Sequence, residues 1–187
     1  MGDSKKAVVL IAEGSEEMEA VITIDVLRRA GVNVTVAGLK DNGPVKCSRD
    51  VVLVPDASLT DALKSGPYDA VILPGGLGGS KLFCESAEVG KLLKEQEASD
   101  RIIGAICAAP TALKSHGIGL GKSITSYPGV GDHLSDSYKY LEDKVVISGK
   151  LVTSRGPGTA FDFGLALAGL LAGKEKADAV AKGLLLL

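Results

Sequence analysis

Continuous apolar runs recur along the chain and predict the strands of its core. Parallel strands that are buried on both faces have unbroken apolar sequences, whereas half-buried strands alternate apolar with polar residues. Residues 6–12 form such a continuous run, and further strands are expected at 33–39, 69–76 and 101–106. Helix-like segments separate these runs, and this alternation predicts an α/β fold in which helices sandwich a doubly wound parallel sheet.

Helical periodicity marks the segments between the strands. Met18, Ile22 and Val26 lie on one face of a helix expected over about 16–30, and Gly31 is a natural end for it. Ser58 and Asp61 have the spacing of an N-terminal capping box. The other expected elements are helices at 81–97, 108–116 and 157–172, a strand at 123–127, and hairpins at 44–54 and 145–154.

Length, composition and charge describe a single globular domain. The 187 residues contain no linker, repeat or low-complexity segment, so we expect one domain over 1–187. A net charge of −2 and the absence of tryptophan argue against nucleic acid as the main partner. The apolar run near the N-terminus is too short for a signal peptide or a membrane span. We therefore expect a cytoplasmic protein without a membrane partner, and the sequence leaves mitochondrial and nuclear pools open.

No pattern in the sequence predicts a bound metal or cofactor. The three cysteines, Cys47, Cys84 and Cys107, are widely spaced and lack the spacing of metal ligands or of a disulfide framework. PGGLGG at 74–79 resembles a phosphate loop but lacks the last required glycine. GIGLGKS at 117–123 has its glycines one residue too close, and it lies between a helix and a strand, which is the reverse of the required order.

Cys107 is the candidate nucleophile because it lies between a strand and a helix. It directly follows the run at 101–106, and Pro110 suits the first turn of a helix. Small neighbours such as Ala108 leave room for a sharp turn, and the N–H groups of Gly76 and Ala108, each just beyond a strand, could form an oxyanion hole. The N-terminus of a helix would lower the pKa of the thiol from its ordinary value of about 8.5. The alternative is a small buried core residue, and the local sequence does not decide between the two.

The loop after the first strand supplies acidic partners for the thiol. It brings Glu13, Glu16, Glu17 and Glu19 to the same end of the sheet as Cys107. Acidic residues in a first helical turn commonly complement the helix dipole, and this interpretation suits Glu16 and Glu17. Glu19 could instead point towards the neighbouring strand end. A desolvated, protonated carboxyl there would hydrogen-bond the thiolate and shuttle a proton.

Four segments together carry a resemblance over essentially the full chain. They are AEGSEEMEA at 12–20, LPGG at 73–76, GAICAAPTAL at 104–113 and TSRGPGTAFDF at 153–163. In these segments the chain resembles the parkinsonism-associated protein deglycase (DJ-one) family of the class I glutamine amidotransferase-like superfamily. The resemblance implies a flavodoxin-like sandwich, a homodimer, a functional pair of Glu19 and Cys107, and a thiol that is oxidised to sulfinate. It also implies protection against oxidative stress and cofactor-free glyoxalase or deglycase activity on α-oxoaldehydes and their protein adducts.

One residue departs from the family pattern. Family members carry histidine in a Thr-His-Pro context, where this chain has Tyr127. His116 and His133 are expected at the surface rather than as replacements. Without a histidine, peptide hydrolysis is not expected, because an amine leaving group needs a proton donor. Addition of a thiolate to an aldehyde demands less, and Glu19 can supply the proton.

The resemblance assigns lesser roles to several other residues. It places Cys47 near a dimer interface with a structural role, and it makes Arg49, Arg155 and Tyr127 candidates for pocket or interface contacts. Cys84 is expected to begin a helix and to be partly exposed, and no activating neighbour is evident for it.

Two functional hypotheses for Cys107 remain open, because they share one site. In the first, Cys107 attacks methylglyoxal or glyoxal, and Glu19 moves protons as the adduct becomes a hydroxy acid; repair of glycated protein is a variant. In the second, the protein is a non-enzymatic redox sensor whose Cys107 sulfinate, stabilised by Glu19, alters the binding of partners. A chaperone that acts through an exposed apolar dimer surface is a third hypothesis.

Overall fold

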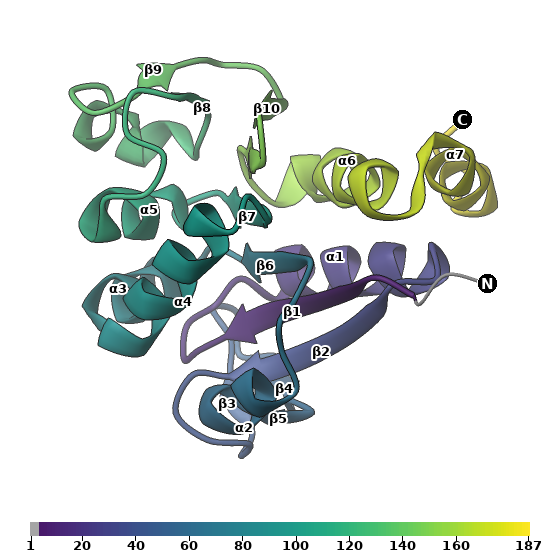
Figure 1. The fold of residues 1–187 in the computed structure, drawn as a ribbon, viewed down its shortest axis with the longest axis horizontal. Coiled ribbons are helices and arrows are strands. Elements are labelled where there is room, and N and C mark those ends of the chain that lie inside the picture. Colours follow the sequence, from purple (N-terminus) through teal and green to yellow (C-terminus); the bar gives the residue numbers. More distant parts are fainter. Residues whose placement is uncertain (1–3) are drawn as a thin grey trace.

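A seven-stranded sheet with the order β10-β11-β7-β6-β1-β2-β5 forms the centre of the structure, a computed structural model that describes residues 4–187 (Figure 1). Its neighbouring strands run parallel, except that β10 and β11 form an antiparallel hairpin. The strands are β1 (Lys6–Ile11), β2 (Asn33–Gly38), β5 (Ala57–Ser58), β6 (Ala70–Leu73), β7 (Ile102–Ile106), β10 (Val145–Ser148) and β11 (Leu151–Ser154).

Helices cover both faces of this sheet (Figure 1). One layer consists of α1 (Glu17–Arg29), α6 (Ala160–Ala172) and α7 (Lys174–Gly183). The other consists of α2 (Leu59–Lys64), α3 (Leu77–Glu85), α4 (Ala87–Ala98) and α5 (Pro110–His116). The predicted doubly wound sheet sandwiched by helices is therefore confirmed. In residues 4–187, no helix has the length and apolar character needed to cross a membrane.

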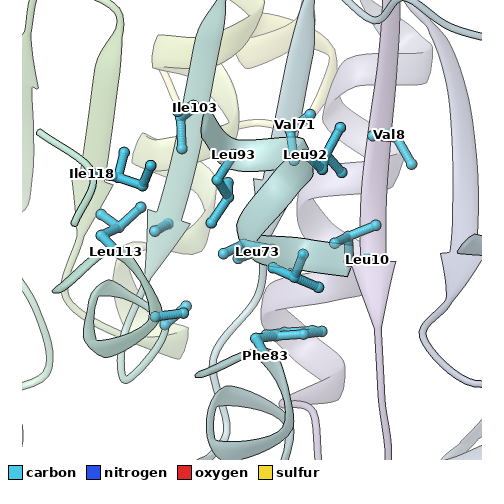
Figure 2. Close-up of a cluster of buried hydrophobic side chains, with 14 of the residues drawn as sticks. Val8, Leu10, Val71, Leu73, Phe83, Leu92, Leu93, Ile103, Leu113 and Ile118 are labelled. Carbon is cyan, nitrogen blue, oxygen red and sulfur yellow. The ribbon is translucent and has the colours of Figure 1, made fainter. Parts of the chain in front are cut away.

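Alternate residues of the central strands enter two separate cores. Val8 and Leu10 of β1 pack towards Phe83 of α3, whereas Ala7 and Val9 pack towards the layer of α1 and α6. Figure 2 shows the first core, where leucines from the strands and from the helices lie together, with the ring of Phe83 at one end of the cluster. Because both faces of β1 are buried, its sequence is apolar without interruption.

Two small two-stranded sheets lie outside the main sheet, one antiparallel and one parallel. The predicted hairpin at 44–54 is confirmed as β3 (Val45–Lys46) paired with β4 (Val52–Leu53). The strand expected at 123–127 is shorter: β8 (Ser123–Ile124) pairs with β9 (Lys139–Tyr140) and does not join the main sheet. Two short 3-10 helices complete the chain: η1 (Pro128–His133) lies between β8 and β9, and η2 (Pro157–Thr159) lies between β11 and α6.

The helices differ from the sequence prediction in two places. The single helix expected at 81–97 is two helices, because Ser86 ends α3 in extended backbone and caps α4 by accepting the Val89 N–H at 3.3 Å. The helix α7 was not predicted. At Ser58 the predicted cap is confirmed, since its hydroxyl accepts the Asp61 N–H at 3.1 Å.

The order of the strands places a crevice at one edge of the sheet. The chain leaves β1 for β2 on one side and later returns to β6 on the other side of β1. In open α/β sheets, ligands bind at the carboxyl ends of strands near such a reversal. The segments that follow β1, β6 and β7 meet at this edge, and they carry Glu19, Gly76 and Cys107.

Candidate functional site

The backbone of Cys107 forms a strained turn directly after β7. Its φ angle is +64°, a left-handed conformation that costs a non-glycine residue about 1–2 kcal/mol. Its N–H donates to the Ser154 carbonyl at 3.0 Å, and its carbonyl accepts the Tyr127 N–H at 2.8 Å. These bonds hold both sides of the turn, which presents the sulfur at the mouth of the crevice much as a nucleophile elbow presents a serine.

Glu19, from the first turn of α1, lies against the sulfur of Cys107. The side chain is fully buried, and its Oε2 accepts the Gly75 N–H at 2.7 Å. Its Oε1 meets no N–H or O–H donor among residues 4–187. The Cys107 thiol is the side chain with which this carboxyl interacts. The structure thus brings together the two residues that the sequence analysis paired.

Burial makes Glu19 a much weaker acid than usual. Desolvation raises its pKa from the ordinary 4.5 to about 7, although the Gly75 N–H and the Cys107 thiol act in the opposite direction. Close to neutral pH this carboxyl can therefore both accept and release a proton, as a shuttle requires.

The pKa of the Cys107 thiol shifts opposite to the sequence prediction. Burial, together with the charge and hydrogen bond of Glu19, raises it to about 12, while the N–H groups of Gly76 and Ala108 act to lower it. The expected lowering by a helix N-terminus was wrong in direction, because desolvation and a neighbouring carboxylate outweigh two N–H dipoles. The pair therefore holds a neutral thiol beside an ionisable carboxyl.

An open cavity of about 640 Å³ lies in front of the sulfur. The predicted pocket residues Arg49 and Tyr127 line it, together with Gly76 and Ala108. Arg155 is not among the lining residues, because its guanidinium donates to the Glu142 carbonyl. Its predicted place in the pocket is therefore not seen in this chain.

A neighbouring carboxylate, Glu17, has a role that the sequence analysis missed. It was expected to complement the helix dipole, but it is only 6% exposed and accepts hydrogen bonds from the Ser48 hydroxyl at 2.7 Å and the Arg49 N–H at 2.8 Å. Burial acts to raise its pKa, but these and further hydrogen bonds hold the pKa below its ordinary value. Glu17 thus fixes the hairpin loop that carries Arg49 to the cavity.

The glycines of PGGLGG allow close approach of two backbones rather than phosphate binding. A Cβ on Gly76 would lie 2.2 Å from the Gly14 carbonyl oxygen, and Gly76 has a φ of +81°. A Cβ on Gly75 would lie 2.5 Å from the Cβ of Cys107. The loop before α1 can therefore pack directly on the start of α3, which closes the site around Glu19.

The remaining candidates lie away from the sulfur. His133 is exposed as expected, whereas His116 is half-buried with Nε2 at 2.8 Å from the Phe83 carbonyl oxygen. Cys47 is buried in the hairpin, and desolvation raises the pKa of its thiol to about 11. Cys84 is half-buried near the end of α3, not at a helix start, with its sulfur 3.5 Å from the Thr111 hydroxyl. In residues 4–187 no cluster of three or more histidine, cysteine or acidic side chains is suited to a metal ion.

The fold and the site define a class of flavodoxin-like α/β proteins with a cysteine at a strained strand-to-helix turn beside a buried glutamate. The chain belongs to the DJ-1/PfpI family, which residues 5–170 match. It is 56% identical to DJ-1beta of Drosophila melanogaster, whose crystal structure superimposes with a TM-score of 0.95 over 98% of both chains. It is 52% identical to the Parkinson disease protein 7 homolog of Danio rerio, over 97% of each chain.

A further relative carries a name that describes an activity. It is the glutathione-independent glyoxalase DJR-1.2 of Caenorhabditis elegans, 45% identical over 100% of this chain and 99% of the relative. The expected family and the flavodoxin-like fold are thereby confirmed.

Proposed function

We propose that the protein is a cofactor-free, cysteine-dependent glyoxalase that converts α-oxoaldehydes such as methylglyoxal to hydroxy acids in the cytoplasm. The observation that carries the proposal is the contact between the Cys107 thiol and a buried Glu19 whose pKa is raised to about 7. The name of the Caenorhabditis elegans relative supports the choice of substrate class.

The chemistry needs only the residues at the cavity. As the sulfur of Cys107 adds to the aldehyde carbon, its proton passes to the Glu19 carboxylate. The N–H groups of Gly76 and Ala108 stabilise the oxyanion of the hemithioacetal. Glu19 returns this proton to the oxyanion and becomes a carboxylate again. The carboxylate then moves a proton from the former aldehyde carbon to the adjacent carbon while the hydroxyl proton passes to the neighbouring oxygen, which gives a thioester of the 2-hydroxy acid. Water hydrolyses the thioester and frees the thiol, so the net reaction is methylglyoxal plus water to lactate.

The test is the formation of lactate from methylglyoxal. Cys107→Ser should abolish it, because an alcohol beside this carboxyl is a far weaker nucleophile than a thiol. Cys84→Ser is the matched control, since Cys84 is half-buried on α3 outside the cavity lining, and it should retain activity. Buffers must be free of amines and added thiols, which react with aldehydes. Unchanged turnover in Cys107→Ser would exclude the proposal.

Repair of glycated proteins is a variant of the same chemistry. An aldehyde adduct on a protein thiol or amine would enter through the open mouth of the cavity, and Cys107 would displace the protein from the adduct. The test is release of the unmodified thiol or amine from a glycated peptide under conditions that scavenge free methylglyoxal. If repair stops when free aldehyde is scavenged, the protein acts only on the free oxoaldehyde.

A second proposed role is the sensing of peroxide by the same thiol. Two peroxide molecules would each transfer one oxygen to Cys107 and leave as water, forming a sulfinate. Protonated Glu19 and the N–H groups of Gly76 and Ala108 are donors for the sulfinate oxygens. A related structure is that of oxidized DJ-1 from Toxoplasma gondii. Peptide mass mapping after mild peroxide should find two added oxygens on Cys107 first; prior oxidation of Cys47 or Cys84 would exclude this role.

We further propose that the protein acts as a homodimer. Val21 of α1 and Val51, Val52 and Val54 of the hairpin are 45–68% exposed, and Glu17 links the two elements. Such a group of exposed apolar side chains is typical of an interface. Sedimentation velocity should show a dimer that Val52→Asp dissociates; a monomeric wild-type protein would exclude it. An apolar face of this kind also underlies the chaperone hypothesis, which the same variant would test with an aggregating client.

A further inference from the structure

The lining of the cavity in front of Cys107 includes exposed apolar side chains. Leu77 is 73% exposed and Tyr127 is 49% exposed, and Pro157 lies with them in the lining. The polar side chains of the lining come instead from Glu16 and the hairpin loop. Exposed apolar side chains that gather beside a reactive group are typical of a surface that contacts a ligand.

The ring of Tyr127 is held in place by the backbone around it. The Tyr127 N–H donates to the Cys107 carbonyl at 2.8 Å, which fixes the Tyr127 backbone relative to the reactive residue. A Cβ on Gly129 would come within 3.0 Å of Cε1, and one on Gly156 within 4.0 Å of Cδ2, so the ring lies against two positions that have no side chain. Within residues 4–187 the Tyr127 hydroxyl makes no hydrogen bond, so contacts of the ring rather than of the hydroxyl determine its position.

The size of the cavity exceeds what a methyl-substituted substrate needs. At 640 Å³ it falls within the range of roughly 300–1,000 Å³ that holds drug-sized ligands. With its aldehyde carbon at the sulfur of Cys107, methylglyoxal would leave the apolar lining exposed to water. A flat apolar substituent on the same head group would cover Leu77 and stack against Tyr127.

We propose that the preferred substrates are α-oxoaldehydes with an aryl substituent, and that Tyr127 is a specificity-determining residue. This inference rests on the proposed glyoxalase function and deepens it. For phenylglyoxal, the sulfur of Cys107 adds to the aldehyde carbon, the proton on that carbon moves to the neighbouring benzylic carbon, and water cleaves the thioester. The products are mandelate and free thiol, so one molecule of water is consumed and no external oxidant or reductant is required.

The kinetic test compares kcat/KM for phenylglyoxal and methylglyoxal. Tyr127→Ala should lower the ratio of the two values, phenylglyoxal over methylglyoxal, about tenfold, the factor that corresponds to 1.36 kcal/mol. Tyr127→Phe keeps the ring and should behave like the wild type. Mandelate and lactate are measured as products, because phenylglyoxal also modifies arginine side chains such as that of Arg49.

Two further variants keep this test decisive. Leu77→Ala removes another exposed part of the apolar lining and should shift the selectivity in the same direction, even if Tyr127→Ala folds poorly. Leu120→Ala is the matched control: its side chain is 59% exposed, and the adjacent Gly119 lies against Leu151 at the opposite end of β11 from the site. Equal losses for both substrates in Tyr127→Ala and Leu77→Ala, or no loss, would overturn the inference and leave the proposed function intact.

A second measurement separates the inference from the proposed function. Phenacyl bromide and bromoacetone alkylate a thiol with loss of bromide, and they differ by the same aryl-for-methyl exchange. Their rates at Cys107, each divided by the rate with N-acetylcysteine, report the preference of the cavity without turnover. If the wild type turns over neither aldehyde, the proposed function fails. In that case, loss of the aryl preference in the alkylation rates of Tyr127→Ala would still support the role of Tyr127. An unchanged preference in these alkylation rates would refute that role.

Discussion

The buried carboxyl of Glu19 should make the stability of the protein depend on pH in a predictable direction. Its pKa is about 7 in the folded chain and 4.5 ordinarily. Below pH 4.5 both states are protonated, and the group has no effect. Between pH 4.5 and 7 the unfolded chain ionises first, so stability falls as pH rises. At 1.36 kcal/mol for each factor of ten in proton affinity, the loss reaches about 3 kcal/mol by pH 8.

Glu19→Gln removes the ionisation and keeps an oxygen that can accept the Gly75 N–H. Urea unfolding of wild type and variant at pH 5 and pH 8, at one protein concentration, gives the two stability differences. Because part of the loss is already present at pH 5, the variant should gain about 2.5 kcal/mol relative to the wild type between these pH values. Taking pH 8 as the upper limit keeps most cysteines of the unfolded chain protonated, because their ordinary pKa is about 8.5.

Glu17→Gln provides the matched comparison on the same helix. The pKa of Glu17 is lowered in the folded state, so its ionised form stabilises the protein. This substitution should therefore destabilise at pH 8, and its effect should shrink as the pH falls below 4.5. If the difference in the free energy of unfolding between Glu19→Gln and wild type were the same at pH 5 and pH 8, burial would not raise the pKa of the Glu19 carboxyl as described.

Three further outcomes are expected. The rate at which iodoacetamide alkylates Cys107 should rise with pH, with a midpoint near pH 7, where Glu19 becomes able to take the thiol proton. In Glu19→Gln the midpoint of this pH profile should move above about pH 8. Identical midpoints in wild type and variant would contradict a proton transfer between the two groups. Gly117→Ala, at a φ of +72° with open space, should cost about 1–2 kcal/mol by thermal unfolding. Gly76→Ala has a similar φ but meets the Gly14 carbonyl, so it should cost a further 1–3 kcal/mol or so and abolish activity; equal costs would show that the two loops are not in close contact.

The fold and the position of the reactive residue could be predicted from the sequence because both depend on local patterns. Burial of both faces of β1 leaves an unbroken apolar run, and Cys107 is recognisable at the end of another such run. The break at Ser86 was missed because the helical periodicity continues across it, and a single capping residue ends one helix and begins the next.

The features of the site that were missed depend on partners outside the local sequence pattern. Glu17 looks like an ordinary first-turn acid, and only the loop at Ser48, 31 residues away, buries it. The pKa of Cys107 was predicted from its helix alone, whereas Glu19, from a different helix, and the packing around the sulfur determine it. The long side chain of Arg155 donates a hydrogen bond to the Glu142 carbonyl and does not line the cavity, and no local sequence pattern specifies this partner.

The hydrogen bonds that hold Cys107 also determine when its reactive geometry can form during synthesis. The residue is tied to Ser154, which follows it by nearly fifty positions, and faces Glu19, which precedes it by almost ninety. A ribosome that has released Cys107 has not yet released β11, so nothing holds the turn at its positive φ. The thiol of a nascent or truncated chain therefore remains an ordinary cysteine. Its special reactivity begins only when the last strand of the sheet is in place.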